Sequence, residues 1–232
     1  MLGYCFANLF HNCTGLTSAP SLTATTLEGG CYYYMFAGCT SLTSAPALTA
    51  TTLKTWCYAH MFMGCTALAS APQLPATNLA QACYYHMFDG CTSLTAAPSL
   101  PATDLSSGIW CYAYMFAGCT SITTSPTLAA TTVSDHCYYA MFYQCSSITT
   151  VANLPATTLE PRCYAHMYNA CPQIKVSQTS SSSYPYTFRV PKSGTGTDAE
   201  DATVAMITNT GGSFTNLVQV NTTYYINNQP VG

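Results

Sequence analysis

Cysteine is the residue type in this sequence with the greatest capacity for chemistry, and it recurs in seven C-x7-C pairs. Zinc fingers and ribbons use C-x2–4-C spacing, so C-x7-C fits a metal site poorly. On a helix, eight residues would span about 12 Å, whereas a disulfide joins Cα atoms within about 7 Å. The fourteen positions are Cys5, Cys13, Cys31, Cys39, Cys57, Cys65, Cys83, Cys91, Cys111, Cys119, Cys137, Cys145, Cys163 and Cys171.

Equivalent cysteines of successive stacked repeats would lie about 4.8 Å apart with parallel Cβ vectors, which is also awkward for a disulfide. We therefore interpret the pairs as two structural ladders of small, buried, free thiols. Disulfides and metal sites are the alternatives, and a thiol count under denaturing, non-reducing conditions separates the three.

Three histidines share one position of the repeat, the fourth residue counted from the first cysteine of a pair. They are His60, His86 and His166, and Asp89 follows His86 by three residues. We expect these side chains on the exposed side of a short helix, within a band of tyrosine and histidine rings. A metal on this surface is the alternative. No buried partner that would orient the rings is evident, so the sequence predicts no metal and no cofactor.

Catalytic motifs are absent from the sequence, which has no G-x-S-x-G, no H-E-x-x-H and no P-loop. The eight carboxylates are scattered, without a second carboxylate in register for acid–base work. A cysteine that recurs in every repeat is expected to be structural rather than a nucleophile. The sequence therefore predicts a protein that is not an enzyme and has no catalytic residues.

The elements that must position these residues follow from the repeat. First cysteines recur every 26 residues, with one step of 28 caused by two extra residues within 106–110. Apolar Cys57, Met61 and Cys65 fall at i, i+4 and i+8, which predicts a helix of about two turns. The next segment, T-S-L-T-x-A-P, predicts a short strand with an inward leucine, ended by Pro72 and its equivalents. The remaining L-P-A-T-x-L predicts a return loop with two inward leucines.

The pattern M-F-x-G-C-T-S-L-T-x-A-P resembles the unit of BspA-type leucine-rich repeats, aF-x-x-C-x-x-L-x-x-I-x-I-P, over residues 1–176. That family occurs in surface proteins of bacteria and in phage proteins, including those of gut Bacteroidales. The resemblance implies an α/β leucine-rich-repeat solenoid of seven coils, with short parallel strands on one face and short helices on the other. It also implies adhesion or recognition as the role, on a bacterial cell surface or a phage virion.

Residues 177–232 are expected to form a C-terminal capping region, since the repeat pattern decays after Ile174. Within it we predict strands at 184–191 and 217–226. A short helix is predicted from a capping box at 197–200 through Ile207. At the other end, Met1 stands where later repeats have a leucine, so we expect the chain to start inside a repeat without a polar cap. No signal peptide is recognisable.

The low content of charged residues limits which classes of partner the protein can bind. Only 6% of the 232 residues are charged and the net charge is −3, whereas 49% are hydrophobic. An ordinary soluble domain has about 25% charged residues. Because no Lys/Arg cluster is present, we expect no nucleic-acid partner. The longest apolar stretch, 109–117, is shorter than the roughly 18 residues of a membrane helix, so we expect no membrane insertion.

Two surfaces remain for binding: an uncharged threonine array on the predicted strand face, and the tyrosine/histidine band on the predicted helix face. At the third position of the repeat, tyrosine alternates with alanine, which interdigitation of large and small side chains explains. Exposed tyrosine nevertheless offers a large contact area at low entropic cost. The candidate ligand-binding residues are Tyr33, Tyr34, His60, Tyr85, His86, Tyr114, Tyr139, His166, Thr43, Thr95, Thr123 and Thr149.

These observations predict a non-enzymatic adhesion or recognition module that binds a glycan or a protein on a cell surface. The alternative is a structural subunit that self-assembles, or packs into a larger particle, through its N-terminal end and charge-poor surface. An ice-binding threonine face is disfavoured because Ala69 interrupts the array. The sequence favours neither binding face over the other.

Overall fold

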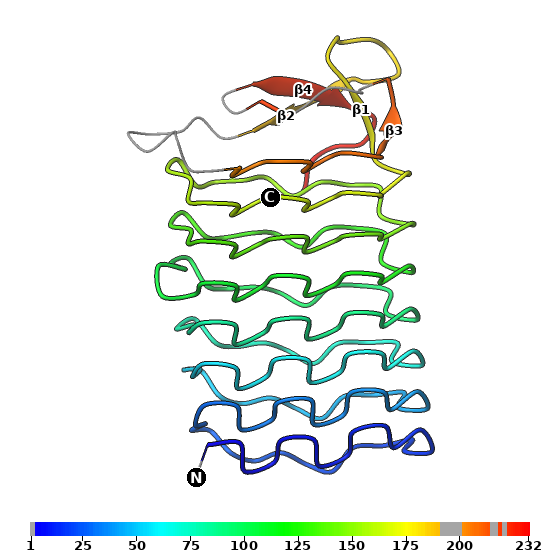
Figure 1. The fold of residues 1–232 in the computed structure, drawn as a ribbon. Helices are drawn as coiled ribbons and strands as arrows, with labels where there is room; N and C mark the ends of the chain where they lie inside the picture. Colours follow the sequence, from blue (N-terminus) through cyan, green and yellow to red (C-terminus); the bar gives the residue numbers. More distant parts are fainter. Residues whose placement is uncertain (1–2, 191–200, 214–217, 220–221) are drawn as a thin grey trace.

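The computed structural model describes residues 3–190, 201–213, 218–219 and 222–232. In this structure the repeats wind into coils that stack one upon another along a single axis, from the N-terminal end to a small sheet at the other end (Figure 1). Hydrogen bonds join each coil to the next in constant register, as from the Tyr32 N–H to the Cys57 carbonyl and from the Tyr58 N–H to the Cys83 carbonyl. The leucine-rich-repeat class itself stays a prediction.

The predicted helices are wrong, because within the described residues each segment between paired cysteines is a run of consecutive turns. In the second repeat the N–H groups of Tyr33 and Met35 donate to carbonyls three residues earlier, at 3.1 Å. The intervening N–H groups of Tyr34 and Phe36 donate instead to carbonyls of the next coil, at 3.1 and 2.9 Å. We call this segment, residues 30–39 and its equivalents, the turn ribbon. Half of its donors close turns and the other half join coils.

A left-handed residue recurs at every fourth position of the turn ribbon. In the second repeat these residues are Gly30, Tyr34 and Gly38, with φ of 65°, 54° and 73°. An α-helix requires negative φ throughout. The ribbon therefore has a period of four, and it places Cys57, Met61 and Cys65 on its buried side just as a helix would. This shared period is the physical reason that the sequence pattern suggested helices.

The predicted strand of the repeat is reduced to an isolated parallel bridge, as between Ser44 and Ser70, and the predicted return loop forms such a bridge too, as between Leu100 and Leu128. The strands that the described part of the chain contains form one sheet at the far end of the stack, in the order β2-β4-β1-β3. They are β1 (Lys175–Ser177), β2 (Tyr186–Arg189), β3 (Gly211–Gly212) and β4 (Thr223–Ile226). β1 pairs parallel with β3, and β4 pairs antiparallel with both β1 and β2.

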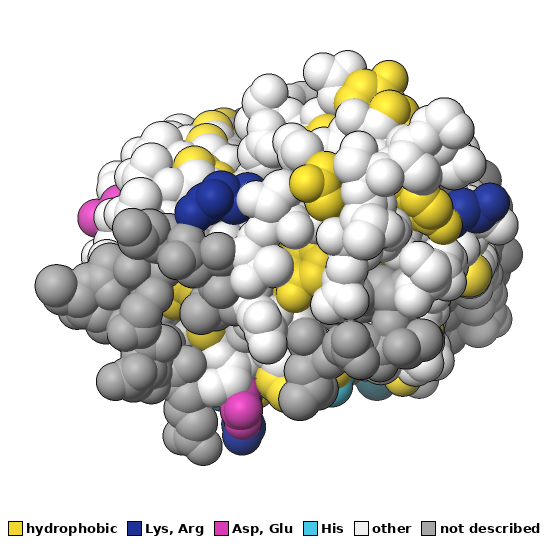
Figure 2. Space-filling view, turned by 90° about the horizontal axis from the view of Figure 1, so that it is seen from above, with side chains coloured by type: hydrophobic (Ala, Val, Ile, Leu, Met, Phe, Trp, Pro, Cys, Tyr) yellow, Lys and Arg dark blue, Asp and Glu magenta, His cyan; other side chains and the backbone are white. Residues whose placement is uncertain are grey.

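Residues 201–209, predicted as the end of a helix, instead form an eighth turn ribbon. The N–H groups of Tyr164 and Tyr168 donate to Ala202 and Met206 at 2.9 and 2.7 Å. Positive φ recurs at Asp201, Ala205 and Asn209. The predicted capping box at 197–200, Met1 and Leu217 lie outside the described residues. Seen from this end, the described surface carries few charged side chains (Figure 2).

The core is built from ladders in which one residue type stacks on its equivalent in the next coil. The phenylalanine ladder has ring centroids 5.4–5.7 Å apart and ring planes within 10° of parallel. A tyrosine ladder through Tyr58 and Tyr84 repeats every 5.5–5.8 Å. The strand leucine, as at Leu68, and both loop leucines, as at Leu74 and Leu79, are buried, as the sequence predicted.

The second cysteine of each pair ties its coil to the one before. The thiol of Cys65 donates to the carbonyl of Phe36 at 3.1 Å, and that of Cys91 donates to Phe62 at the same distance. The equivalent bond recurs from Cys39 through Cys171 at 3.0–3.1 Å. The second cysteine ladder is thus a row of thiol donors bonded across the coils.

Gly64, with φ of 72°, tests the left-handed positions of the turn ribbon. An added Cβ would meet only the backbone of Gly38, at 3.8 Å, so φ alone sets the cost of substitution. Gly64→Asn should keep the stability, because Asn12 occupies the equivalent position at φ 59°. Gly64→Val should lower the free energy of unfolding by about 1–2 kcal/mol. Urea unfolding measures both variants.

Gly15→Val is the matched control, because Gly15 has a negative φ and open space around its Cβ position. It should leave the urea midpoint unchanged. Equal midpoints for the Asn and Val variants of Gly64 would contradict the assigned backbone geometry.

Candidate functional site

One side of the turn ribbons carries a nearly continuous run of aromatic rings, which we call the aromatic band. Its residues come from three positions of the repeat: the residue before the first cysteine of a pair, and the third and fourth residues counted from that cysteine. The band consists of Tyr33, Tyr34, Trp56, His60, Tyr85, His86, Trp110, Tyr114, His136, Tyr139 and His166. It contains all eight ring residues that the sequence predicted.

Within the band, the fourth-position rings stack face to face. Tyr34 and His60 have centroids 4.1 Å apart, His60 and His86 5.0 Å, and His86 and Tyr114 4.4 Å. Their planes lie within 14° of parallel. The left-handed backbone at this position aims each ring along the same direction in every coil, so the ladder follows from the turn geometry.

The third-position tyrosines stand edge-on to this ladder. Tyr33 lies at 87° to His60, with centroids 5.6 Å apart, and Tyr85 lies at 83° to His60 at 5.2 Å. Trp56 sits between these two tyrosines, edge-on to both. Ala59 is fully buried beneath them. The Tyr/Ala alternation therefore interdigitates, which is the steric explanation given above, and it also presents a patterned aromatic surface.

His60 is buried, with 7% of its surface exposed, which corrects the prediction that it faces solvent. Burial, together with the smaller effect of the nearby His86, lowers the pKa of His60 to about 3. The imidazole is therefore neutral at physiological pH and acts as a packed ring. His86 pairs with Asp89 through Nδ1 and Oδ2 at 2.6 Å, and its ring stacks on His60, so the structure brings His60, His86 and Asp89 together.

Among the residues that the structure describes, no group of three or more His, Cys, Asp or Glu side chains converges as a metal site would require. His166, the third histidine of this position, lies two coils beyond Tyr114. Its Nδ1 lies 3.0 Å from the Asn169 amide nitrogen. Burial and Arg162 lower the pKa of His166. It is another neutral ring.

The threonine array is partly occupied by bonds between coils. The hydroxyls of Thr43 and Thr95 donate to carbonyls of the preceding coil at 3.4 Å, and that of Thr149 does so at 3.1 Å. Thr43, Thr95 and Thr123 are exposed, whereas Thr149 is half-buried. The protons of these hydroxyls are already used in hydrogen bonds between coils, so the threonines offer a ligand mainly hydrogen-bond acceptors. We therefore take the aromatic band as the better candidate site.

All fourteen cysteines carry free thiols in this structure, with Cys5 and Cys13 exposed and the other twelve buried. The Sγ atoms of Cys5 and Cys31 lie 3.2 Å apart. Burial raises the pKa of Cys57 and of Cys65 to about 12. Because a thiol and not a thiolate is present in such surroundings, these buried cysteines are poor nucleophiles and metal ligands.

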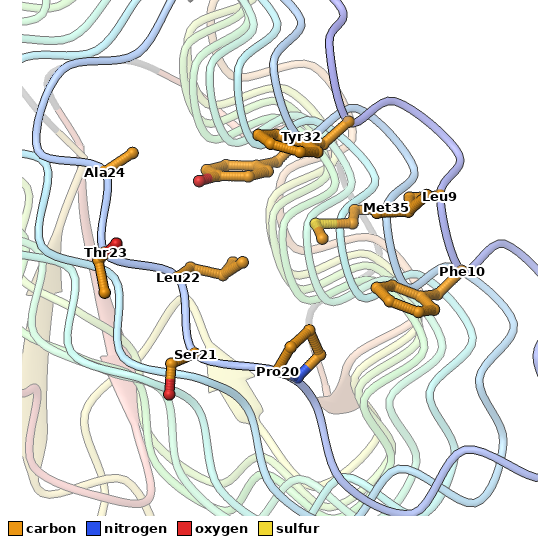
Figure 3. Close-up of a pocket in the computed structure, with 10 residues that line it drawn as sticks. Leu9, Phe10, Pro20, Ser21, Leu22, Thr23, Ala24, Tyr32 and Met35 are labelled. Carbon is orange, nitrogen blue, oxygen red and sulfur yellow. The ribbon is translucent and has the colours of Figure 1, made fainter.

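The first coil presents an apolar face. Tyr4, Phe6 and Leu9 are 57%, 37% and 54% exposed. A cavity of about 270 Å³ lies beside them. Figure 3 shows Leu9, Phe10 and Met35 across this cavity from Leu22 and Pro20. The same rings continue the core ladders, since Phe6 stacks on Tyr32 and Phe10 on Phe36.

No family model, no curated protein and no solved structure matches this chain. The likeness to BspA-type repeats thus rests on the quoted motif alone. In the described residues, no helix has the length and apolar character needed to cross a membrane.

Sequence reasoning missed part of the band. Trp56, Trp110 and His136 precede a first cysteine and pack against the third-position tyrosines. Trp110 stacks on His136 with centroids 3.9 Å apart. The signal was present in the repeat, because these bulky rings stand at one and the same position, directly before Cys57, Cys111 and Cys137.

The buried ring of His60 predicts how stability depends on pH. Its pKa is about 3 in the folded chain against a usual 6.5, so only the unfolded chain takes up this proton between these values. Stability is therefore full above pH 6.5 and falls as the pH drops toward 3, by up to about 1.4 kcal/mol per pH unit from this group. His60→Tyr, which keeps a stacking ring, should flatten this fall. Urea unfolding between pH 7 and 4 measures the difference.

Both chains keep every other titratable group, so the difference between the two slopes isolates His60. Identical slopes would show that His60 titrates normally in the folded protein.

Proposed function

We propose that this protein is a non-enzymatic recognition module that binds a glycan or a protein through the aromatic band. The observation that carries the proposal is the combination of half-exposed, edge-on tyrosines with a stacked His/Tyr ladder. Aromatic rings with a polar tip offer large contact area at little entropic cost, as binding surfaces require. By analogy with BspA-type repeats, the setting would be a bacterial cell surface or a phage virion.

The scarcity of charged side chains favours an uncharged ligand. The chain has 6% charged residues, and the His60 and His166 rings of the band are held neutral by burial. Two carboxylates are paired with rings of the band: Asp89 with His86 and Asp135 with His136. Such a surface neither steers nor repels a charged partner at a distance, so contact and shape decide what binds.

Tyr85 tests this proposal, because its ring contacts Trp56, His60, His86 and Trp110. Tyr85→Ala should lower retention on a glycan array, or on a gut bacterial surface fraction, about tenfold or more. Tyr186→Ala is the matched control, since Tyr186 is 40% exposed and lies on β2, outside the band. Equal losses in both variants, or none in Tyr85→Ala, would contradict binding through the band.

A second candidate function is self-assembly, and the apolar face of the first coil favours it. A second copy seated there would cover Tyr4, Phe6 and Leu9 and fill the adjoining cavity. Burying one such side chain contributes about 1.5–3 kcal/mol. This proposal needs no ligand for the aromatic band.

Leu9→Ser separates the two candidates. If the first coil mediates assembly, the wild-type chain sediments as a multimer and Leu9→Ser shifts it to the monomer, because a polar side chain weakens the apolar contact. Ile109→Ser is the control, since Ile109 is 39% exposed but belongs to a different coil. A monomeric wild-type chain in sedimentation velocity would rule out assembly through this face.

A further inference from the structure

The fourth-position ladder of the aromatic band lacks one ring. Tyr34, His60, His86 and Tyr114 stack in successive coils, the next coil has Ala140, and the ladder resumes at His166. Ala140 is buried and shares the left-handed backbone of its equivalents, with φ of 51°. The ladder therefore lacks a ring here because the side chain is alanine, while the backbone keeps the same conformation as in the other coils.

A cavity of about 270 Å³ occupies this gap. Its lining residues are Tyr114, Tyr139, Ala140, Tyr143, His166 and Asn169. Tyr114 and His166 stand two coils apart, or about 10 Å at the usual spacing of about 4.8 Å per coil. Rings of the ladder lie 4.1–5.0 Å from their neighbours, so this gap matches one six-membered ring placed between two faces.

Tyr139 forms the side wall of the gap. It lies 5.4 Å from both Tyr114 and His166, tilted at 59° and 57° to their planes. Tyr33 and Tyr85, beside complete stretches of the ladder, are edge-on to His60 at 87° and 83°. The plane of Tyr139 is thus less steeply inclined to its neighbours than those of Tyr33 and Tyr85, and Tyr139 lines the cavity.

Polar groups surround the gap without any charge among them. Tyr143 and Tyr139 supply phenol hydroxyls and Asn169 supplies an amide. The Asn169 Nδ2 atom lies 3.0 Å from His166 Nδ1, and the lowered pKa of His166 leaves its ring neutral. Two neutral faces with hydrogen-bonding groups at the edges suit a ring that has apolar faces and hydroxyls around its rim.

We infer that the gap above Ala140 is a subsite for one neutral pyranose ring, held between Tyr114 and His166. This inference rests on the proposed function and names its ligand class and its position. A benzene ring from a protein would contact the two faces alone, whereas the rim hydroxyls of a sugar can also accept from the phenol of Tyr143, whose oxygen accepts from Gln144 Nε2. A charged sugar finds no counter-charge among the lining residues.

The test fills the gap with the chain's own ladder residue. Ala140→Tyr places there the ring that Tyr34 and Tyr114 have at the same backbone geometry. The probes are neutral trisaccharides: triacetylchitotriose, cellotriose and maltotriose. We expect at least one to bind the wild-type chain in calorimetry and to receive saturation transfer from aromatic protons. Ala140→Tyr should weaken this binding about tenfold or more.

Asn8→Tyr is the matched control, because it adds the same ring at the same position of the repeat, at φ 59°, in the first coil. It should leave trisaccharide binding unchanged. His166→Ala is a second variant, which removes one face instead of filling the gap and should also weaken binding about tenfold. It keeps the inference testable if Ala140→Tyr does not fold.

The outcomes distinguish the subsite from the broader proposal. If Ala140→Tyr and His166→Ala bind as the wild type does while Tyr85→Ala loses retention, the subsite is wrong and recognition by the band stands. If p-cresol binds the wild-type chain and no trisaccharide does, the gap takes an aromatic side chain and the sugar assignment is overturned. If no probe binds and Tyr85→Ala retains cells like the wild type, both proposals fail.

Discussion

The whole structure depends on how the turn ribbon divides its backbone donors. Alternate N–H groups close turns within a coil, and the others reach carbonyls of the next coil at 2.7–3.2 Å. A coil alone would leave half of these donors unpaired, at a cost of about 1–3 kcal/mol for each one that is buried. Stacking therefore satisfies the backbone and the apolar side chains together, and neither a single coil nor a helix achieves this with the same residues.

The constant register of these bonds turns every position of the repeat into a ladder. Phe62 stacks on Phe88, Tyr58 on Tyr84, and the Cys91 thiol reaches the carbonyl of Phe62. The aromatic band arises from the same constant register at the surface, where the residue type varies from coil to coil. The binding function that we propose depends on departures from the repeat, such as Ala140 in a row of rings.

Several features of the fold and of the aromatic band could be predicted from the sequence. The repeat length, the inward leucines such as Leu68, and the band rings at the third and fourth positions could be predicted, because they depend on spacing alone. The helices could not, since apolar residues four apart fit both a helix and the turn ribbon. The burial of His60 depends on how Tyr33 and Tyr85 lean over it. The eighth ribbon was missed because Ala202 and Thr210 stand where cysteines mark the others.

The direction of the bonds between coils has a mechanical consequence. They run along the stacking axis (Figure 1), so a pull applied between the two ends of the stack loads the bonds of all coils in series, and one interface between coils can open while the others hold. Each released coil of 26 residues adds roughly 90 Å of slack. A molecule anchored at one end and attached to a surface at the other would yield in steps, lengthening under flow instead of detaching.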